Sequence, residues 1–421
     1  MPNKMLVDDV ILKSGLMILH EKCQFLGRVD TQYDNSYSGN GGKRGDTIRL
    51  RKPARYSVRK GQTLSLQDHV EENTSLTASI QAGVDVEFTS ADLTLSLDDF
   101  KANVLDPQMS DLASDTEATF LTSMLGMKNG IGVNPLTFKD VQRAKAFLTQ
   151  QTTPVGDRFF AIDSEDQVDI VDELKGLFQS SSEIDRQYKE GTMGKTGGFT
   201  FFESDRMPTY TSTSDTAVLT GATIASAPSD GFNQVVVDGA TAGTLLAGTI
   251  FSIAGIKAVH PQTKRSYSAD FSFVVIEDVV LTGTGDILKT YGFVDYTNIN
   301  IQPPAGNKGL EAGQVSYVVG GANAPRANIS ALPQVGDVIT AIEGQNLSQS
   351  LAFHKKALTF ATIDLNMPKG VDMSARENFE GLSMRLVRQY DIKDDVYPSR
   401  FDILYGYQIM RQEYCVRVIH T

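Results

Sequence analysis

The first part of the chain changes from a helical hydrophobic pattern to an alternating one. Residues 5–22 place apolar side chains close to helical spacing, which predicts a short amphipathic helix. Residues 33–45 are rich in Gly, Asn and Ser and predict a linker. Within residues 46–80, polar and apolar positions alternate at 47–51 and 62–66, which predicts a long hairpin. Neither face of this hairpin is apolar enough for a core of its own, so we expect it to need another surface.

A second helix is predicted at about residues 107–125. Asp106 suits the N-cap, and Pro107 suits the first helical position, where its missing donor costs nothing. An apolar stripe follows at Met109, Leu112, Ala113, Phe120, Leu121 and Met124. The glycines between residues 126 and 132 contain the expected stop.

Residues 137–203 have α/β character. Two patterns resemble capping boxes, which mark helix starts. They are Thr137-x-x-Asp140 and Ser164-x-x-Gln167. Between them, the apolar run Arg158–Ile162 predicts a buried strand.

The composition changes near Tyr210 to Thr, Ser, Gly, Ala and Val. Residues 212–342 show no lasting helical period and predict an all-β domain. Its strands are expected at Gln234–Val237, Ile250–Ala254, Phe271–Ile276 and Val315–Val319. Residues 343–421 return to mixed structure, with dense apolar runs that should belong to a core. This order indicates that the β domain is inserted into a surface loop of a host domain.

Charge divides the chain unevenly. The chain holds 39 basic and 51 acidic residues, a net charge of −12, which argues against a surface built to grip nucleic acid. Residues 43–60 nevertheless carry eight basic residues against one acidic residue, and residues 85–117 carry nine acidic residues against one basic. The basic run is either a solvated face or an arm that docks on an acidic surface of a partner.

The search for catalytic chemistry gives no candidate. Gly191–Thr196 looks like a phosphate loop, but only two residues separate its glycines, where the loop needs four. None of the five histidines pairs at helical spacing, and two cysteines cannot form a zinc site from protein ligands alone. No run approaches the roughly 20 apolar residues of a membrane helix. We therefore expect no enzyme, no cofactor, no metal and no membrane partner.

The order of elements resembles the major capsid proteins of tailed phages, which have the Hong Kong 97-type fold. The β insertion is similar to that of the P-twenty-two-type coat proteins of short-tailed phages. The strings that carry this resemblance are Arg186–Thr192, Gly248–Lys257, Phe271–Val275, Asn346–Phe360 and Arg400–Gly406. The resemblance covers essentially the whole chain and implies an α+β fold of that type with an inserted all-β domain.

The resemblance also implies roles for the parts of the chain. They are an N-terminal arm at 1–45, an extended hairpin loop at 46–80, a peripheral domain with a spine helix at 81–127, an axial domain at 128–211 and 343–421, and the inserted β domain at 212–342. The implied function is a major capsid protein that self-assembles into the icosahedral shell around a double-stranded DNA genome.

Such a subunit implies several partners. It would join copies of itself as hexamers and pentamers in the host bacterial cytoplasm and end in the virion. A scaffolding protein, a portal protein at one vertex, DNA bound without sequence specificity, and decoration proteins are the other expected partners.

The charge pattern adds candidate contacts between subunits. We expect Arg49, Arg51, Lys52, Arg55, Arg59 and Lys60 of one copy to face Asp98, Asp99, Asp106, Asp111 and Asp115 of a neighbour. Contacts between different patches propagate into rings or lattices.

Two alternatives compete with this interpretation. The chain could be a non-capsid viral structural or adhesive protein that uses the β domain as a binding module. It could also be an enzyme that uses Lys195 and Thr196 on a phosphate.

Overall fold

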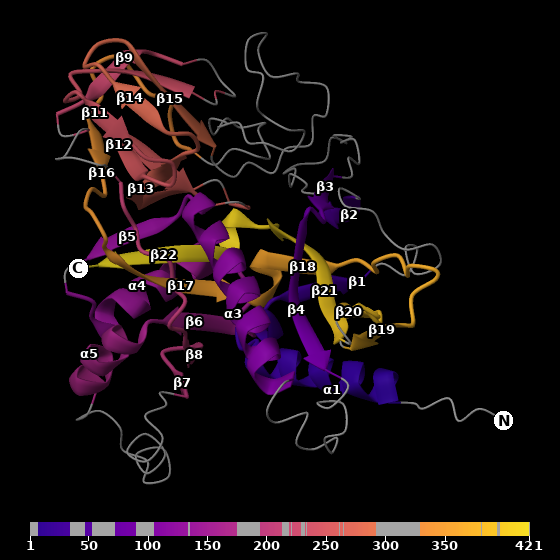
Figure 1. Ribbon diagram of the computed structural model, residues 1–421. Helices are drawn as coiled ribbons and strands as arrows, with labels where there is room; N and C mark the ends of the chain where they lie inside the picture. The colour runs from indigo at the N-terminus through magenta and orange to yellow at the C-terminus, as the bar shows by residue number, and fades with distance from the viewer. Residues whose placement is uncertain are drawn as a thin grey trace, which may run out of the picture. The chain divides into compact units, whose positions relative to one another are not determined.

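The computed structural model describes most of the chain (Figure 1). The described residues are 7–33, 47–52, 72–89, 105–133, 135–174, 194–212, 219, 221–228, 232, 234–260, 262–263, 265–291, 329–379, 381–393 and 396–420. Contacts divide the chain into two units. Unit 1 comprises residues 1–50, 75–121 and 358–410, and unit 2 comprises residues 51–74, 122–357 and 411–421.

Unit 1 contains a six-stranded sheet in the order β1-β18-β21-β20-β19, with β4 also paired to β21. The strands are β1 (Asp30–Tyr33), β4 (Ile80–Thr89), β18 (Leu358–Thr362), β19 (Met373–Phe379), β20 (Leu382–Arg388) and β21 (Val396–Ile409). β1 runs parallel to β18, and the other pairs are antiparallel.

Strand β21 is the centre of this sheet. It pairs with β4 along ten residues, from Val396 opposite Thr89 to Tyr405 opposite Ile80. The two backbones approach so closely that a Cβ atom on Gly83 would lie 2.5 Å from the carbonyl oxygen of Phe401. Only glycine fits there without moving one of the two strands.

Two helices, α1 (Val7–Lys22) and α3 (Asp106–Thr122), supply apolar side chains to the core of unit 1. The ring of Phe120 on α3 lies 5.7 Å from that of Phe360 and 5.4 Å from that of Tyr407. A buried carboxylate ties the segment after α1 to the same helix, because Glu117 Oε1 accepts a hydrogen bond of 2.7 Å from the backbone N–H of Phe25. The apolar stripe predicted from the sequence is therefore buried, and its Phe120 lies against residues of the sheet.

Unit 2 contains a second six-stranded sheet in the order β5-β22-β17-β6-β8-β7. The strands are β5 (Gly130–Val133), β6 (Arg158–Ile162), β7 (Lys195–Thr196), β8 (Phe199–Glu203), β17 (Ser348–His354) and β22 (Cys415–His420). The helices of this unit are α4 (Phe138–Gln150) and α5 (Ser164–Leu174). Val141, Ala144 and Leu148 of α4 pack with Phe160 of β6 in one apolar core.

Residues 223–341 of unit 2 contribute a third six-stranded sheet, in the order β16-β12-β13-β15-β10-β9. Its strands are β9 (Thr223–Ser226), β10 (Gln234–Asp238), β12 (Ile250–Val259), β13 (Ser266–Val275), β15 (Asp286–Tyr291) and β16 (Ile339–Ala341). β11 (Gly243–Leu245) and β14 (Val279–Leu281) form a separate pair. The stacked rings of Phe251 and Phe273, 5.3 Å apart, lie in a core of this segment's own residues.

The chain runs into and out of this β-rich segment through one short stem. Tyr210 and Leu347 form a bridge in which each backbone N–H donates to the carbonyl of the other, at 2.8 and 2.9 Å. Ser212 N donates to Gly344 O at 3.0 Å directly beyond the bridge. The two ends of the segment are therefore held side by side.

The remaining elements are short. β2 (Thr47–Lys52) and β3 (Glu72–Thr77) form a two-stranded sheet. The 3-10 turns are η1 (Leu26–Arg28), η5 (Ser123–Gly126), η6 (Lys355–Ala357) and η7 (Gln412–Tyr414).

Most local predictions are confirmed. The first helix is α1, the helix at about 107–125 is α3, and the strand at 158–162 is β6. The last turn predicted for α3 is the 3-10 turn η5, because a helix end tightens where its carbonyls lose intrahelical partners. The capping box at Thr137 forms with Asp140. Three predicted strands of the β segment appear as β10, β12 and β13.

One local prediction is wrong, and others fall outside the described residues. Ser164 does not cap its helix but begins it, and its hydroxyl donates to Glu203 Oε1 at 2.5 Å, while its backbone N–H donates to Asp163 Oδ1. The predicted strand Val315–Val319 and the alternation at 62–66 lie outside the described residues. The predicted domain boundaries stay a prediction, although residues 358–410 share the sheet of unit 1 with β4.

Candidate subunit-contact surfaces

The predicted contact residues are only partly within the described chain. Arg49, Arg51 and Lys52 belong to β2, and Asp106, Asp111 and Asp115 belong to α3. Arg55, Arg59, Lys60, Asp98 and Asp99 lie outside the described residues. The pairing of the two groups between neighbouring copies stays a prediction.

Helix α3 carries part of the predicted acidic surface. Asp111 and Asp115 are exposed and lie four residues apart, so they share one face of the helix. Met109, Leu112 and Phe120 are buried. The helix thus separates a core face from an acidic face, as its sequence predicted.

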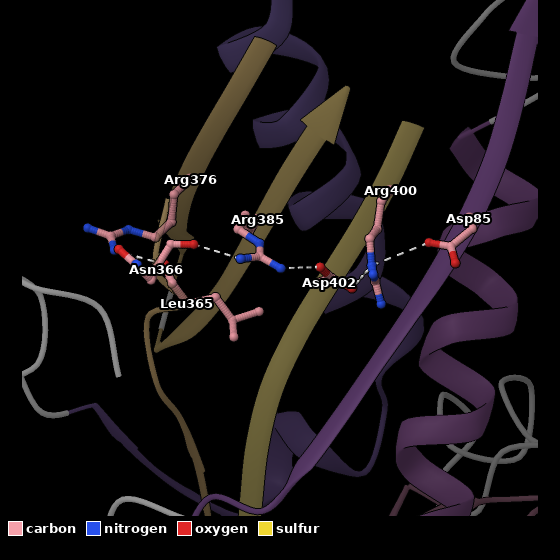
Figure 2. Close-up of polar contacts among 7 residues, drawn as sticks. All are labelled: Asp85, Leu365, Asn366, Arg376, Arg385, Arg400 and Asp402. Atoms are coloured by element: carbon pink, nitrogen blue, oxygen red, sulfur yellow. Dashed lines mark hydrogen bonds and ion pairs between the residues drawn. The ribbon is translucent and has the colours of Figure 1, made fainter. Parts of the chain in front are cut away.

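A second charged surface, on the sheet of unit 1, was not predicted. We call it the charged sheet face and define it by Asp85 on β4, Arg400 and Asp402 on β21, Arg385 on β20 and Arg376 on β19 (Figure 2). Successive side chains of a strand point to opposite faces, so residues two apart, such as Arg400 and Asp402, share this face. The strand pairing then brings charges from four strands together.

Asp402 is the centre of the charged sheet face. Its side chain is 0% exposed, and each of its oxygens accepts a hydrogen bond, from Arg385 Nη2 at 2.5 Å and from Arg400 Nε at 2.7 Å (Figure 2). The hydrogen bond and the charge of Asp402 raise the pKa of Arg400. A carboxylate without solvent needs such partners, because burying an unpaired charge costs several kcal/mol.

The outer members of the charged sheet face are more exposed. Arg400 is 53% exposed and reaches Asp85, itself 72% exposed, at 3.5 Å. An open groove of about 490 Å³ adjoins this pair. It is lined by Asp85, Val86, Glu87, Val387, Gln389, Pro398, Ser399 and Arg400. The groove offers both charge signs to an extended segment.

The sequence does hold a signal for this surface. Asp85 and Glu87 alternate with apolar residues along β4, and Arg400 and Asp402 do so along β21. Such alternation predicts one charged face for each strand. It does not say which strands are neighbours, so the cluster could not be assembled from sequence.

Unit 2 brings together a serine, a histidine and an aspartate that sequence spacing did not reveal. His420 Nε2 on β22 lies 3.4 Å from Ser350 Oγ on β17 and 3.3 Å from Asp166 Oδ2 on α5. A catalytic triad needs the serine and the carboxylate on different nitrogens of the ring. Here both face Nε2, so the group lacks the relay of a nucleophilic site.

Burial changes the pKa of both ionisable members. Desolvation raises the pKa of Asp166 to about 6, with further contributions from Asp163, Asp169 and Glu165. Desolvation lowers the pKa of His420 to about 4, against the attraction of Asp163 and Asp169. His420 is therefore neutral at pH 7 and serves as a buried structural group.

The other groups considered from sequence are also structural. His354 is buried, and its Nδ1 accepts a hydrogen bond from Lys356 N at 3.0 Å, as expected for a locally paired histidine. Cys23 and Cys415 are buried and are not joined in a disulfide. Within the described ranges, no cluster of three or more His, Cys, Asp or Glu side chains could hold a metal ion. Nor is any helix of those ranges long and apolar enough to cross a membrane.

Comparison with known families gives one match over most of the chain. The model described as "P22 coat protein - gene protein 5" matches residues 43–417 of the 421. No curated protein matches the sequence.

Solved structures give more distant similarities. The structure titled "Mycobacterium phage Che8" is 11% identical and has a TM-score of 0.42, with coverage of 93% of this chain and 89% of that chain. The capsid of cyanophage P-SCSP1u is 11% identical with a TM-score of 0.41, and covers 93% of this chain and 86% of its own. The CUS-3 coat protein I-domain is 19% identical with a TM-score of 0.19, over 30% of this chain and 96% of that domain.

Replacing Asp402 with Asn tests the centre of the charged sheet face. We expect the variant to lose about 3–5 kcal/mol of unfolding free energy, because the change leaves the guanidinium groups of Arg385 and Arg400 without their buried carboxylate. Urea denaturation followed by circular dichroism measures this loss. Asp85→Asn is the matched control, and its exposed pair with Arg400 should cost less than about 1 kcal/mol. Equal losses in the two variants would contradict a central role for Asp402.

Replacing Asp166 with Asn should change how stability depends on pH. The raised pKa of Asp166 makes stability fall as pH rises from 3.8 to about 6, because the folded state holds the proton more tightly. The lowered pKa of His420 makes stability fall as pH drops from 6.5 to about 4. These opposite dependences offset each other in the wild-type protein.

Asp166→Asn removes the first dependence and leaves the second. Its stability should therefore rise with pH between about 4 and 6.5, by up to about 3 kcal/mol at about 1.4 kcal/mol per pKa unit. Urea midpoints across this pH range provide the measurement. Asp172→Asn, on the exposed side of the same helix, should keep the wild-type profile. Parallel profiles for wild type and Asp166→Asn would show that the two groups are not coupled to folding in this way.

Proposed function

Because the chain belongs to the P22 coat protein family, we propose that its copies join as hexamers and pentamers into an icosahedral shell that encloses double-stranded DNA. The protein is a major capsid protein, and its place is the virion. The fold predicted from sequence, an α+β fold of the Hong Kong 97 type, is the fold of this family. The observation that carries the assignment is the match over residues 43–417.

We assign the shell-forming roles to the parts of the chain predicted from sequence. The axial domain, residues 128–211 and 343–421, makes the contacts within hexamers and pentamers. For residues 128–211, 343–357 and 411–421 this assignment is supported by the sheet of unit 2, in which β22 and β17 lie between β5 and β6, whereas residues 358–410 lie in unit 1. Residues 212–342 form the inserted domain, and residues 1–45, 46–80 and 81–127 are the arm, the extended loop and the peripheral domain.

Lateral contacts between subunits come from the basic run at residues 43–60, in the arm and the extended loop, and the acidic face of α3. The exposed pair Asp111 and Asp115 on α3 supports this assignment. One exposed ion pair contributes only about 0–1 kcal/mol, so the contact needs many pairs repeated over the shell. The charges set register and specificity, and apolar burial supplies more of the affinity.

The remaining partners follow from shell assembly in the host cytoplasm. A scaffolding protein sets the size of the precursor shell, a portal protein occupies one vertex, and decoration proteins bind outside. The net charge of −12 supports a loose inner contact with DNA, without readout of sequence.

Shell formation is tested by velocity sedimentation of the expressed protein, followed by electron microscopy of the fast fraction. We expect closed shells or curved sheets with a regular lattice. A lasting monomer in the presence of a co-expressed scaffolding protein would overturn the proposal.

Charge reversal tests the lateral contact. Changing Arg51, Arg55 and Arg59 to Glu should reduce the yield of closed shells at least ten-fold, because like charges would then face the acidic helix. Changing Asp111 and Asp115 to Lys in the same chain should restore part of the yield. The control changes the same three arginines to Lys, which keeps the positive charge at each position and should leave the yield of closed shells unchanged. Normal shells from the arginine variant would refute the pairing of arm and helix.

A further inference from the structure

Arg417 is a fully buried arginine at the base of the β-rich segment of unit 2. It lies on β22 and is 0% exposed. Its Nη2 donates to the carbonyl oxygens of Met127 and Gly248, at 2.7 and 2.8 Å. Its Nη1 lies 3.5 Å from Gln349 Oε1 on β17. One guanidinium therefore joins residues from four separate stretches of the chain.

The two carbonyl partners lie next to strands of two different sheets. Met127 directly follows the turn η5 and lies just before β5. Gly248 lies just before β12, inside the β-rich segment, and is 169 residues from Arg417 in sequence. Arg417 thus connects the β5-β22-β17 sheet directly to the segment that the stem at Tyr210 and Leu347 introduces.

The backbone around Gly248 is tightly packed where the β-rich segment meets the β5-β22-β17 sheet. Gly248 has a φ of +92°, and a Cβ atom there would lie 2.9 Å from the carbonyl oxygen of Leu125. Its own N–H donates to Val275 O at 2.7 Å. The turn that presents its carbonyl to Arg417 therefore requires glycine at this position.

Tyr210 lines the same junction. Its ring centroid lies 5.6 Å from the Arg417 guanidinium carbon. Its hydroxyl donates to Ile342 O at 2.6 Å and accepts from Ile250 N at 3.2 Å. Lys128 adds a second cation, with Nζ 4.2 Å from the centroid of the Phe271 ring. Polar groups with strict geometry, and not apolar packing alone, fill this seam.

The energetics indicate what this arginine contributes. Burying a guanidinium costs several kcal/mol, and its hydrogen bonds mainly recover that cost, so an apolar side chain of similar volume would serve stability as well. What only the guanidinium supplies is a planar set of donors at set angles. Arg417 therefore contributes more to the orientation of the groups that it contacts than to the free energy of unfolding.

We propose that Arg417 is a positioning residue that holds the β-rich segment in one orientation on the β5-β22-β17 sheet. The stem at Tyr210 and Leu347 keeps the segment attached, and Arg417 sets its angle. The segment packs a core of its own, and the sheet that carries Arg417 is formed by the pairing of β22 with β5 and β17. This role belongs to the single subunit, so it is tested apart from shell formation.

The test measures a distance distribution in the unassembled full-length subunit. Spin labels are placed on cysteines introduced at Thr284, in the β-rich segment, and at Glu165, on α5, both of which are exposed. The native Cys23 and Cys415 are buried and leave these labels unique. Pulsed electron paramagnetic resonance should give one narrow distance peak for the otherwise wild-type chain.

Arg417→Met should broaden this peak at least two-fold, because it leaves the Met127 and Gly248 carbonyls without the guanidinium. Arg417→Lys retains the charge but lacks the planar set of donors, so it should broaden the peak to an intermediate width. This variant provides the test if Arg417→Met does not fold. Arg158→Met is the matched control. Arg158 is also buried, but its hydrogen bonds go to Thr149, Thr153 and Pro154, within its own sheet and helix region.

Arg158→Met should leave the distance peak narrow, because the Arg158 hydrogen bonds do not reach the β-rich segment. A narrow peak in folded Arg417 variants would overturn the proposal. Equal broadening in the Arg158 and Arg417 variants would also overturn it, because both would then reflect general loss of stability.

Discussion

The pairing of β21 with strands on both of its edges is the constraint on which unit 1 depends. β4 pairs along one edge and arrives from early in the chain, whereas β20 and β18 pair with it from late in the chain. Gly83 must be glycine because the two backbones meet there. This pairing turns one face of the sheet toward the core with Phe120 and gathers the charges around Asp402 on the other. Detaching β21 would therefore leave the edges of β4 on one side and of β18 and β20 on the other unpaired.

Elements that depend on neighbouring residues could be predicted from the sequence. Pro107 and the apolar stripe were enough to place α3, and the Thr137–Asp140 pair was enough to place the start of α4. The Ser164 prediction failed because the Ser164 hydroxyl donates to Glu203 on β8, which is distant in sequence, while its backbone N–H donates to Asp163, one residue earlier. Local chemistry could suggest a helix start there but could not decide which residue begins it.

The polar clusters could not be predicted, because each depends on contacts between distant segments. Arg385, Arg400 and Asp402 meet only after β20 and β21 have paired in one register. Arg417 and Gly248 are 169 residues apart and carry no shared motif. The function could be predicted without these contacts, because the resemblance to the coat proteins depends on the order of elements along the chain. The structure adds how single side chains hold those parts.

The stem of the β-rich segment has a consequence for how such proteins diversify. Tyr210 and Leu347 bond to each other across a bridge, so the two ends of the segment leave the host sheet side by side. The bridge closes the whole segment into a loop. Adding residues to the segment lowers the free energy of unfolding only slightly, because the entropy cost of closure grows with the logarithm of loop length. The segment is in this sense a module attached to the host sheet through one fixed bridge. The segment can therefore change length at its far end, provided that the bridge and the turn at Gly248, which Arg417 contacts, are kept.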